Sequence, residues 1–374
     1  MRLKSRTLRP DRRPRLLVLN WRDPWHPEGG GSELYVQQVC RRLAAGGVTV
    51  TMFTARYPGA RRDEVREGIR YLRRGGHVTV YLWAALLLAT RRLRGFDRVL
   101  EVQNGMPFLA GLFTRRPVVV LVHHVHREQW SILGPALARV GWFMESRVAV
   151  RINRGNRYVA VSEATREELA GLGVRAADVR VAYNGTPAMP SADVPGPDET
   201  PRVVVLSRLV PHKQIEHALD ATARLVEAVP GLQLDVVGAG WWHDHLVADV
   251  QRLGLEERVT FHGHVTDEEK FQILSRAWVH LLPSVKEGWG LAIVEAATVG
   301  VPSLAYRSAG GVRESIQEGV TGLLADGYED LVEQLRRLLT DEPLRSSLGE
   351  KARIRSGSFT WPATTASVRA ALEI

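Results

Sequence analysis

Short apolar runs alternate with helical patterns along almost the whole chain, and this alternation limits the fold more than any other feature of the sequence. A first series of expected strands occupies residues 15–20, 48–54, 98–102, 118–123, 158–161 and 179–183. A second series begins with the run VVVLS after Arg202 and continues at residues 232–237, 258–261, 279–282 and 303–305. Strands separated by helices are typical of parallel sheets that helices cover. The sequence therefore predicts an α/β protein built from doubly wound sheets.

A proline-rich segment separates the two series of strands. Prolines stand at positions 187, 190, 195, 197 and 201, a composition typical of a linker. The chain has 374 residues, which is more than one hydrophobic core usually holds. We therefore expect a basic tail at residues 1–14, a first doubly wound domain at 15–186, a linker at 187–201 and a second doubly wound domain at 202–357.

The charge of the chain is concentrated at its beginning. The formal net charge is +9, and the first fifteen residues carry seven basic side chains against one acid, Asp11. A solvated tail and attraction to an anionic membrane surface both fit this pattern. Nucleic acid is not an expected partner, because the chain has no basic stripe interleaved with aromatic residues and no known binding motif.

The expected compartment follows from cysteine usage and apolar runs. Cys40 is the single cysteine, which excludes an internal disulfide framework and suits a reducing environment. The basic first fifteen residues lack the apolar run of a secretory signal. The longest apolar run, at residues 78–89, is interrupted by Thr79 and is too short to cross a bilayer. We expect a cytoplasmic protein, either in solution or on the inner face of the cell membrane.

Neither domain opens with the complete glycine fingerprint GxGxxG of nicotinamide-dependent enzymes. The segment WRDPWHPEGGGSE has adjacent glycines, and VVGAGWW supplies only the first pair. This argues against an ordinary dehydrogenase. Ligands of doubly wound sheets bind beyond the carboxyl ends of the strands, so two facing domains would enclose their ligand in a cleft.

The segment SVKEGWGLAIVEAA at residues 284–297 has the composition of an anion-binding turn. Gly288 and Gly290 allow the backbone to approach a bound group closely, and the free N–H groups at 291–294 of the following helix favour an anion. Glu287 lies in the turn and Glu295 in the helix, so the two carboxylates can meet different parts of one elongated ligand. A phosphate-bearing ligand fits this arrangement.

Motifs in both halves of the chain resemble those of a known family. Residues from about 202 to 325 look like the C-terminal domain of the family 4 retaining glycosyltransferases, which have the GT-B architecture of two Rossmann-like domains. The motifs SRLVPHKQ, DVVGAG, RVTFHGHV, LLPSVKEGWGLAIVEAATVGVPSLAY and GGVRESIQEGVTGLL occur in the family's order. The first half is similar in PEGGGSELYVQQVCRRLAAGGVTVT, PVVVLVHH, YVAVSEATREEL and VRVAYNGT. The resemblance also implies that residues 358–374 form a helix that returns to the first domain.

On the donor side, the resemblance implies that Arg208 and Lys213 hold the donor diphosphate. These residue types suit the chemistry, because cleavage of a sugar–nucleotide bond leaves a diphosphate, and fixed cations must neutralise its charge. The Arg guanidinium can donate two hydrogen bonds to phosphate oxygens, and Lys adds a point charge. Without the resemblance, both would be taken for solvated loop residues. Glu295 matches the family's carboxylate that accepts hydrogen bonds from the ribose hydroxyls of the donor. Glu287 matches the carboxylate that faces the transferred sugar. Further donor contacts are implied at Gly238, Gly288, Trp289, Gly290 and Leu291.

On the first domain, Gly30 and Gly31 match the family's glycine pair, where backbone N–H groups can reach a phosphate or the acceptor. A flexible surface turn is the other interpretation. His123 ends a strand, and the match implies a contact with the transferred sugar or the acceptor. The sequence HHVH around it has no carboxylate or cysteine partner at a familiar metal-binding spacing. We expect no metal and no other cofactor.

The implied function is transfer of a hexose from a nucleoside-diphosphate sugar to a glycan, lipid-linked or small-molecule acceptor, with retention of configuration and without a metal. Transfer at the front face of the sugar is the family's usual mechanism, whereas Glu287 as a covalent nucleophile is the alternative. A sugar-nucleotide epimerase and a non-catalytic binder of sugar nucleotides or polyanions are the other functions considered. Ser207, Gln214 and Trp289 depart from the family's usual residues. The sequence leaves the donor base, the sugar and the acceptor open.

Overall fold

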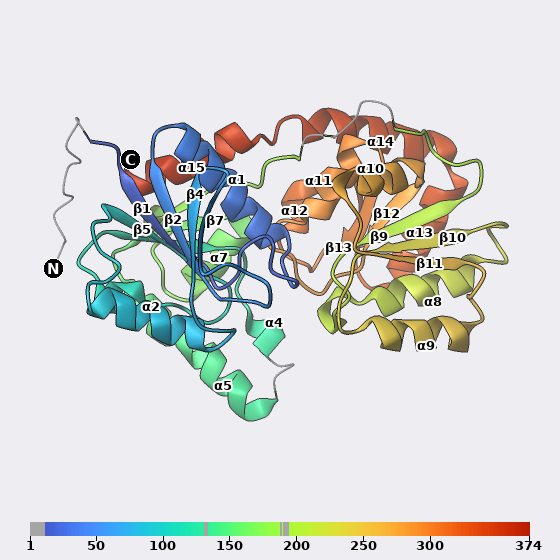
Figure 1. Cartoon of the computed structure of the whole chain (residues 1–374). Helices are drawn as coiled ribbons and strands as arrows, with labels where there is room; N and C mark the ends of the chain where they lie inside the picture. Colours follow the sequence, from blue (N-terminus) through green and yellow to red (C-terminus); the bar gives the residue numbers. More distant parts are fainter. Residues whose placement is uncertain (1–11, 131–133, 188, 190–193) are drawn as a thin grey trace. The chain divides into compact units, whose positions relative to one another are not determined.

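The computed structural model describes residues 12–130, 134–187, 189 and 194–374 (Figure 1). The chain divides into two compact units. The first contains the residues up to Gly185 together with Trp361–Ile374, and the second is Thr186–Thr360. Most of the predicted basic tail lies outside the described residues.

The first unit is built on an eight-stranded sheet, as far as the described residues show, in the order β3-β4-β2-β1-β5-β6-β7-β8. All neighbours are parallel except β3 and β4, which form an antiparallel hairpin at one edge. The strands β5 and β6 are buried along their whole length; β6 reads as the continuous apolar run VVVLV, whereas β5 also buries Arg98, Glu101 and Gln103. The strands are β1 (Arg15–Leu19), β2 (Thr49–Thr54), β3 (Asp63–Arg66), β4 (Ile69–Arg73), β5 (Arg98–Gln103), β6 (Val118–Val122), β7 (Arg157–Ala160) and β8 (Val179–Val181).

Helices connect these strands. They are α1 (Gly31–Ala45), α2 (Thr79–Ala89), α3 (Ala110–Phe113), α4 (Arg127–Trp130), α5 (Pro135–Phe143), α6 (Val150–Ile152) and α7 (Glu163–Gly171), with a π-helical turn at Met144–Ala149 before α6. The last helix of the chain, α15 (Trp361–Leu372), also belongs to this unit. The Thr364 hydroxyl donates to the carbonyl of Tyr183 at 2.7 Å, and the Arg98 side chain donates to the carbonyl of Leu372 at 2.8 Å. The C-terminal helix is therefore fixed to the strands of the N-terminal half.

The described residues of the second unit form a six-stranded sheet in the order β11-β10-β9-β12-β13-β14, and its paired strands are parallel. The helices α8 and α9 cover one face, and α10 and α11 cover the other (Figure 1). The strands are β9 (Arg202–Leu206), β10 (Gln233–Val237), β11 (Val259–Gly263), β12 (Val279–Leu282), β13 (Ser303–Tyr306) and β14 (Gly322–Ala325). The helices are α8 (Ile215–Leu225), α9 (His243–Leu253), α10 (Asp267–Arg276), α11 (Leu291–Thr298), α12 (Val312–Ser315), α13 (Tyr328–Thr340) and α14 (Glu342–Ser356).

Successive residues of β9 enter two different cores, as the period of a strand requires. Val203 and Val205 pack in the larger cluster with α8 and α13, whereas Val204 packs with Phe271 of α10 and Ala296 of α11. A strand buried on both faces favours apolar residues at successive positions, which explains the sequence VVVL. These two parallel-sheet units confirm the predicted α/β class.

The strand order of the second unit reverses next to β9. The chain passes from β9 to β10 and β11 on one side, and then returns to β12 on the other side of β9. Such a reversal leaves the loops after the two central strands diverging at the carboxyl edge, where doubly wound sheets bind their ligands. In this unit, the loops in question follow Leu206 and Leu282.

The structure adds elements that were not expected. The β3–β4 hairpin and strand β14 were both missed. The described part of the predicted linker packs on the second unit, because Val194 contacts the cluster around Phe271 and the amide of Asp198 donates to the carbonyl of Arg276 at 3.0 Å. Among the described helices, none combines the length and the apolar character that a membrane span requires.

Candidate functional site

Two loops meet at the carboxyl edge of the second sheet. The loop after β9 contains a short 3₁₀ turn, Pro211–Lys213, and the loop after β12 contains Glu287. The backbone amide of Val285 donates to the carbonyl of His212 at 3.0 Å. The ammonium of Lys213 donates to Oε1 of Glu287 at 2.6 Å. Two residues that are 74 positions apart in the sequence thus form one ion pair at the strand-order reversal.

Glycines allow a third loop to join this pair of loops. The amide of Glu287 donates to the carbonyl of Ala309 at 2.8 Å, and the amide of Gly311 donates to the carbonyl of Glu287 at 3.0 Å. A Cβ atom on Gly311 would lie 2.0 Å from the carbonyl oxygen of Gly288, so only glycine fits there. Gly290 has φ +85°, the left-handed region that favours glycine, and it directly precedes α11. The glycines at 290 and 311 therefore have structural roles that require no ligand.

The Glu287 carboxylate is ionised by its partner. Only 13% of its side-chain surface is exposed, and burial on its own would raise the pKa of the carboxyl group. The charge of Lys213 and its hydrogen bond outweigh burial, so the pKa of Glu287 lies below its ordinary value. An ionised carboxylate can accept hydrogen bonds from hydroxyl groups.

The Glu295 carboxylate lies on α11 and has a partner that the sequence did not reveal. The ammonium of Lys270, on α10, donates to Oε1 of Glu295 at 2.7 Å and to Oδ1 of Asp267 at 2.7 Å. Burial nevertheless prevails and raises the pKa of Glu295, although the charge of Lys270 opposes this effect. The pKa values of Glu287 and Glu295 therefore shift in opposite directions, because Lys213 outweighs burial at Glu287 and burial outweighs Lys270 at Glu295.

Arg208 lies in the loop after β9 and its side chain is exposed. Within the described part of the chain its guanidinium makes no ion pair, unlike Lys213. The segment VVGAG holds this loop in place, because a Cβ atom on Gly238 would lie 2.0 Å from the carbonyl oxygen of Ser207. The close approach of two backbones therefore explains Gly238 without a bound donor.

Trp289, an implied donor contact, has a buried side chain. This side chain is 2% exposed and packs edge to face against Phe359, with ring centroids 4.9 Å apart. Its ring therefore packs within the second unit. Leu291 begins α11, and no side chain caps that helix start.

In the first unit, Gly30 precedes α1, which begins at Gly31. The amide of Gly30 donates to Oε2 of Glu33 at 2.8 Å, and the side chain of Arg22 donates to the other oxygen of Glu33 at 3.3 Å. Glu33 is fully buried. The expectation that this glycine turn offers free amides is therefore wrong for Gly30, whose N–H group is already used.

His123 directly follows β6 and is 6% exposed. Burial, together with the nearby His126, lowers the pKa of His123 to about 3, so the ring is neutral near pH 7. Its Nε2 atom is buried and makes no hydrogen bond to any described residue. A buried polar atom without a partner marks a place where a ligand could complete the hydrogen bonding.

The neighbouring His126 has a partner from a more distant part of the chain. His126 Nδ1 lies 3.2 Å from Oε1 of Glu145, a fully buried carboxylate that also accepts a hydrogen bond from the ring of Trp130 at 2.7 Å. No carboxylate was expected for the HHVH segment, because Glu145 lies 19 residues after His126. Local spacing gave no sign of this contact.

Comparison with known proteins agrees with these two units. Residues 29–189 match the family model described as Glycosyltransferase Family 4, and residues 191–355 match the one described as Glycosyl transferases group 1. An exopolysaccharide phosphotransferase of Streptomyces coelicolor is 37% identical over 46% of this chain and 18% of its own length. A D-inositol 3-phosphate glycosyltransferase of Corynebacterium diphtheriae is 31% identical over 45% of this chain and 41% of its own length. The alignments thus span less than half the length of these two relatives.

Other relatives align along almost the whole chain. A D-inositol 3-phosphate glycosyltransferase of Kribbella flavida is 26% identical over 97% of this chain and 96% of its own length. Among solved structures, sucrose-phosphate synthase of Thermosynechococcus elongatus has a TM-score of 0.81 at 22% identity, with 96% of this chain and 98% of that chain covered. HepE of Anabaena, solved with UDP-glucose, has a TM-score of 0.75 at 21% identity, covering 96% and 99%. These structures show that the fold is GT-B.

Replacing Lys213 by Met tests the ion pair at the centre of the site. In the wild type, the lowered pKa of Glu287 means that its ionised form stabilises the fold above the ordinary value of 4.5, and this contribution is lost as the pH falls through the lowered pKa. Without Lys213, burial raises that pKa. We expect K213M to lose about 2 kcal/mol of unfolding free energy at pH 7, and the difference from the wild type to shrink at pH 4.

Urea unfolding at both pH values measures this difference. K351M, which removes an exposed lysine of α14, is the matched control and should unfold like the wild type at both. A K213M deficit that is equally large at pH 4 and pH 7 would show that Glu287 does not depend on Lys213 for its charge.

Proposed function

This chain belongs to the family 4 glycosyltransferases of the GT-B fold, and we propose that it transfers a hexose from a nucleoside-diphosphate sugar to an acceptor with retention of configuration. The observation that carries the proposal is the Lys213–Glu287 pair at the strand-order reversal of the second unit, with the exposed Arg208 in the same loop as Lys213. The acceptor class is a glycan, a lipid-linked sugar or a small molecule. Neither an epimerase nor a non-catalytic binder is favoured by the relatives.

The donor pyrophosphate would bind at the carboxyl edge of the second sheet. Arg208 is an exposed guanidinium, which can donate two parallel hydrogen bonds to phosphate oxygens. Lys213 carries three N–H donors and gives one to Glu287, so the others can reach the leaving diphosphate. The start of α11 adds backbone N–H groups without a side-chain cap. These groups neutralise the charge of the leaving group, and we propose that no metal ion is needed for this step.

The two carboxylates would bind the two sugars of the donor. Glu287 is ionised and can accept hydrogen bonds from hydroxyls of the transferred hexose, whereas Glu295, held by Lys270, would accept from the ribose. We propose front-face transfer, in which the departing phosphate takes the proton of the acceptor hydroxyl. Glu287 then orients the sugar and does not become covalently attached to it. We propose that His123, whose Nε2 atom has no partner among the described residues, is a ligand contact of the first unit.

Replacing Glu287 by Gln removes the charge and keeps the size of the side chain. We expect turnover of a labelled sugar nucleotide to fall by about 100-fold, a loss typical of removing one electrostatic contact at a reacting centre. The assay uses UDP-, GDP- and ADP-hexoses with and without acceptor extracts, because slow donor hydrolysis reports activity even when the acceptor is unknown. E257Q, at an exposed position of the same unit, is the control. A near-normal rate for E287Q would remove Glu287 from the site.

We also propose that the first unit binds an anionic membrane surface. The helix α2 buries Val80, Ala84 and Leu88 at a spacing of four residues, yet Leu82 and Leu86 on its other side are 68% and 51% exposed. Apolar residues on both sides of a helix in this unit indicate a second apolar partner. Leu88 faces the core, so Leu82 and Leu86 are the leucines of α2 that this partner would contact.

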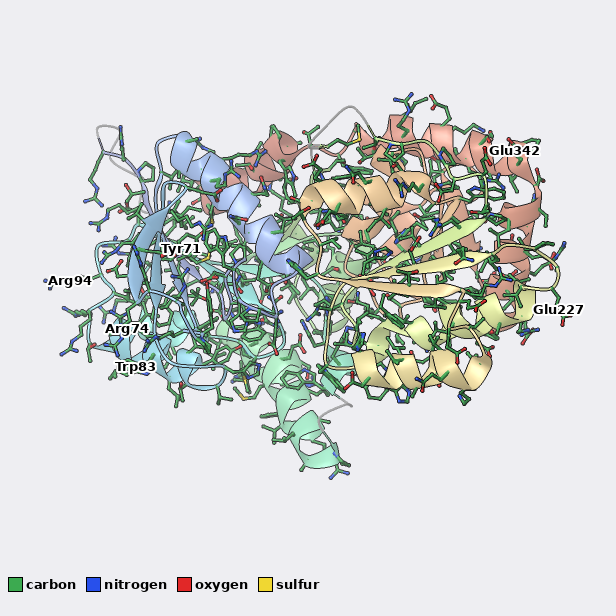
Figure 2. All side chains as sticks on the ribbon, turned by 45° about the vertical axis from the view of Figure 1, so that its right-hand side comes forward. Tyr71, Arg74, Trp83, Arg94, Glu227 and Glu342 are labelled. Carbon is green, nitrogen blue, oxygen red and sulfur yellow. The ribbon has the colours of Figure 1, made fainter. Side chains whose placement is uncertain are left out.

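Other exposed residues support the same partner. Leu137, Val140 and Phe143 of α5 are each more than half exposed. Arginines stand before and after α2 in the sequence, and Figure 2 shows Trp83 with Arg74 and Arg94 projecting from one side of this unit. Apolar side chains that enter the headgroup region, flanked by arginines that attract anionic lipids, are typical of proteins that lie on a bilayer.

Vesicle flotation tests the membrane proposal. We expect the protein to float with vesicles of phosphatidylglycerol and phosphatidylcholine, and to float much less with phosphatidylcholine alone. The double variant L82E/L86E should lose most of this binding, because two charges must then enter the apolar layer. I354E, which changes an exposed isoleucine of α14 in the other unit, should bind like the wild type. Equal flotation of L82E/L86E and the wild type would contradict a role for α2.

A further inference from the structure

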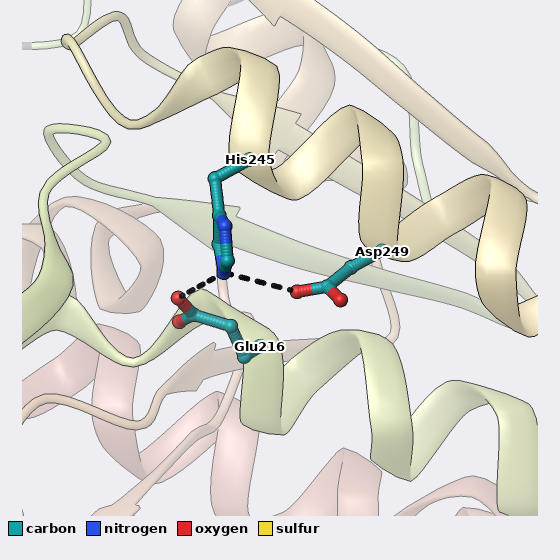
Figure 3. Close-up of side chains that lie close together, drawn as sticks. All are labelled: Glu216, His245 and Asp249. Carbon is teal, nitrogen blue, oxygen red and sulfur yellow. Dashed lines mark ion pairs between the residues drawn. The ribbon is translucent and has the colours of Figure 1, made fainter.

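Three potential metal ligands converge on the face of the second unit that α8 and α9 cover (Figure 3). His245 and Asp249 lie four residues apart on α9 and therefore on one side of that helix, and Glu216 comes from the first turn of α8. Nε2 of His245 is 3.9 Å from Oε1 of Glu216 and 3.6 Å from Oδ2 of Asp249. Among the described residues, this is the one group of three or more ligand side chains with such convergence.

The distances do not correspond to hydrogen bonds. Both exceed the range of 2.7–3.2 Å that N–H···O bonds occupy, so the imidazole is close to two carboxylates without bonding to either. A tetrahedral zinc ion bound at its usual bond lengths separates its ligand atoms by about 3.3–3.6 Å. The observed separations are near this range, and small side-chain rotations would close the difference.

Neighbouring side chains orient each of the three ligands. Arg252 donates twice to Oδ1 of Asp249, at 2.6 and 3.0 Å, which leaves Oδ2 facing His245. Trp242 donates from its ring nitrogen to Oε1 of Glu216 at 2.5 Å. The same indole lies against the imidazole of His245, with ring centroids 4.2 Å apart. Ligands of metal sites are usually held by such outer contacts, which fix their direction.

We propose that Glu216, His245 and Asp249 bind a divalent transition metal ion, with water completing its coordination. One imidazole and two carboxylates suit Zn²⁺, Co²⁺ or Mn²⁺ better than Mg²⁺ or Ca²⁺, which prefer oxygen ligands alone. The two carboxylates carry two negative charges, and Arg252 compensates only one of them. This site is separate from the donor chemistry proposed above and does not depend on it.

A bound ion would have a structural consequence. Glu216 follows Lys213 by three residues, so a metal ion would tie the start of α8, next to the loop that carries Arg208 and Lys213, to the start of α9. Because an ion that binds only the folded chain stabilises it by mass action, the ion should raise the unfolding temperature. We expect it to restrict the motion of the Lys213 loop as well.

Isothermal titration of the EDTA-treated full chain with ZnCl₂ tests the proposal. We expect one site with micromolar or tighter affinity and a rise in unfolding temperature with Zn²⁺. H245A should bind at least about tenfold more weakly, since loss of a direct ligand should cost no less than loss of an outer contact, and D249N should be weakened too. H243A is the matched control, because His243 is also an exposed histidine of α9 but pairs with Asp244.

Circular dichroism confirms that each variant is folded before titration. The proposal is overturned if the wild type binds no Zn²⁺ at micromolar concentration. It is equally overturned if H245A and D249N bind Zn²⁺ as tightly as the wild type, because the ion would then be held by other histidines of the chain.

Discussion

The ion pair between Lys213 and Glu287 connects the two loops on which the rest of the site depends. One loop follows β9 and the other follows β12, and these strands adjoin where the strand order of the second sheet reverses. Parallel strands place both loops at the same edge, but only a specific contact fixes how closely they approach. The glycine at 311 then lets a third loop pack against the second without a side chain between them. The strand order thus brings the loops to one edge of the sheet, and the ion pair then fixes the distance between them.

Opposite shifts in acidity distinguish the two glutamates. Both carboxylates are largely buried and each has a lysine partner, yet the pKa of Glu287 is lowered and that of Glu295 is raised. At Glu287 the lysine prevails over burial, whereas at Glu295 burial prevails over the lysine. A buried carboxylate that is paired with a lysine can still accept hydrogen bonds from hydroxyl groups. Each glutamate here has its own lysine, so the two do not form a carboxyl pair that shares one proton.

Much of the fold could be predicted from the sequence, because apolar runs of a buried strand depend on local composition alone. VVVL at β9 and VVVLV at β6 are examples. Contacts between distant residues could not be predicted this way. The Lys270–Glu295 pair, Glu145 beside His126 and Glu216 beside His245 each join residues whose spacing carries no signal. Gly238 was predicted for a ligand, although its neighbour is the Ser207 carbonyl, since a glycine pattern does not say what approaches it.

Binding of nucleoside diphosphates to the full chain tests the central claim most directly, namely that fixed cations of the second unit hold the donor pyrophosphate. Isothermal titration would compare UDP and GDP with their nucleosides, for the wild type and for R208A, in EDTA. One diphosphate should bind the wild type without a metal, and R208A should bind it at least about tenfold more weakly, as expected for loss of a charged hydrogen bond, with nucleoside affinity unchanged. Equal affinity of R208A and the wild type for that diphosphate would contradict the claim.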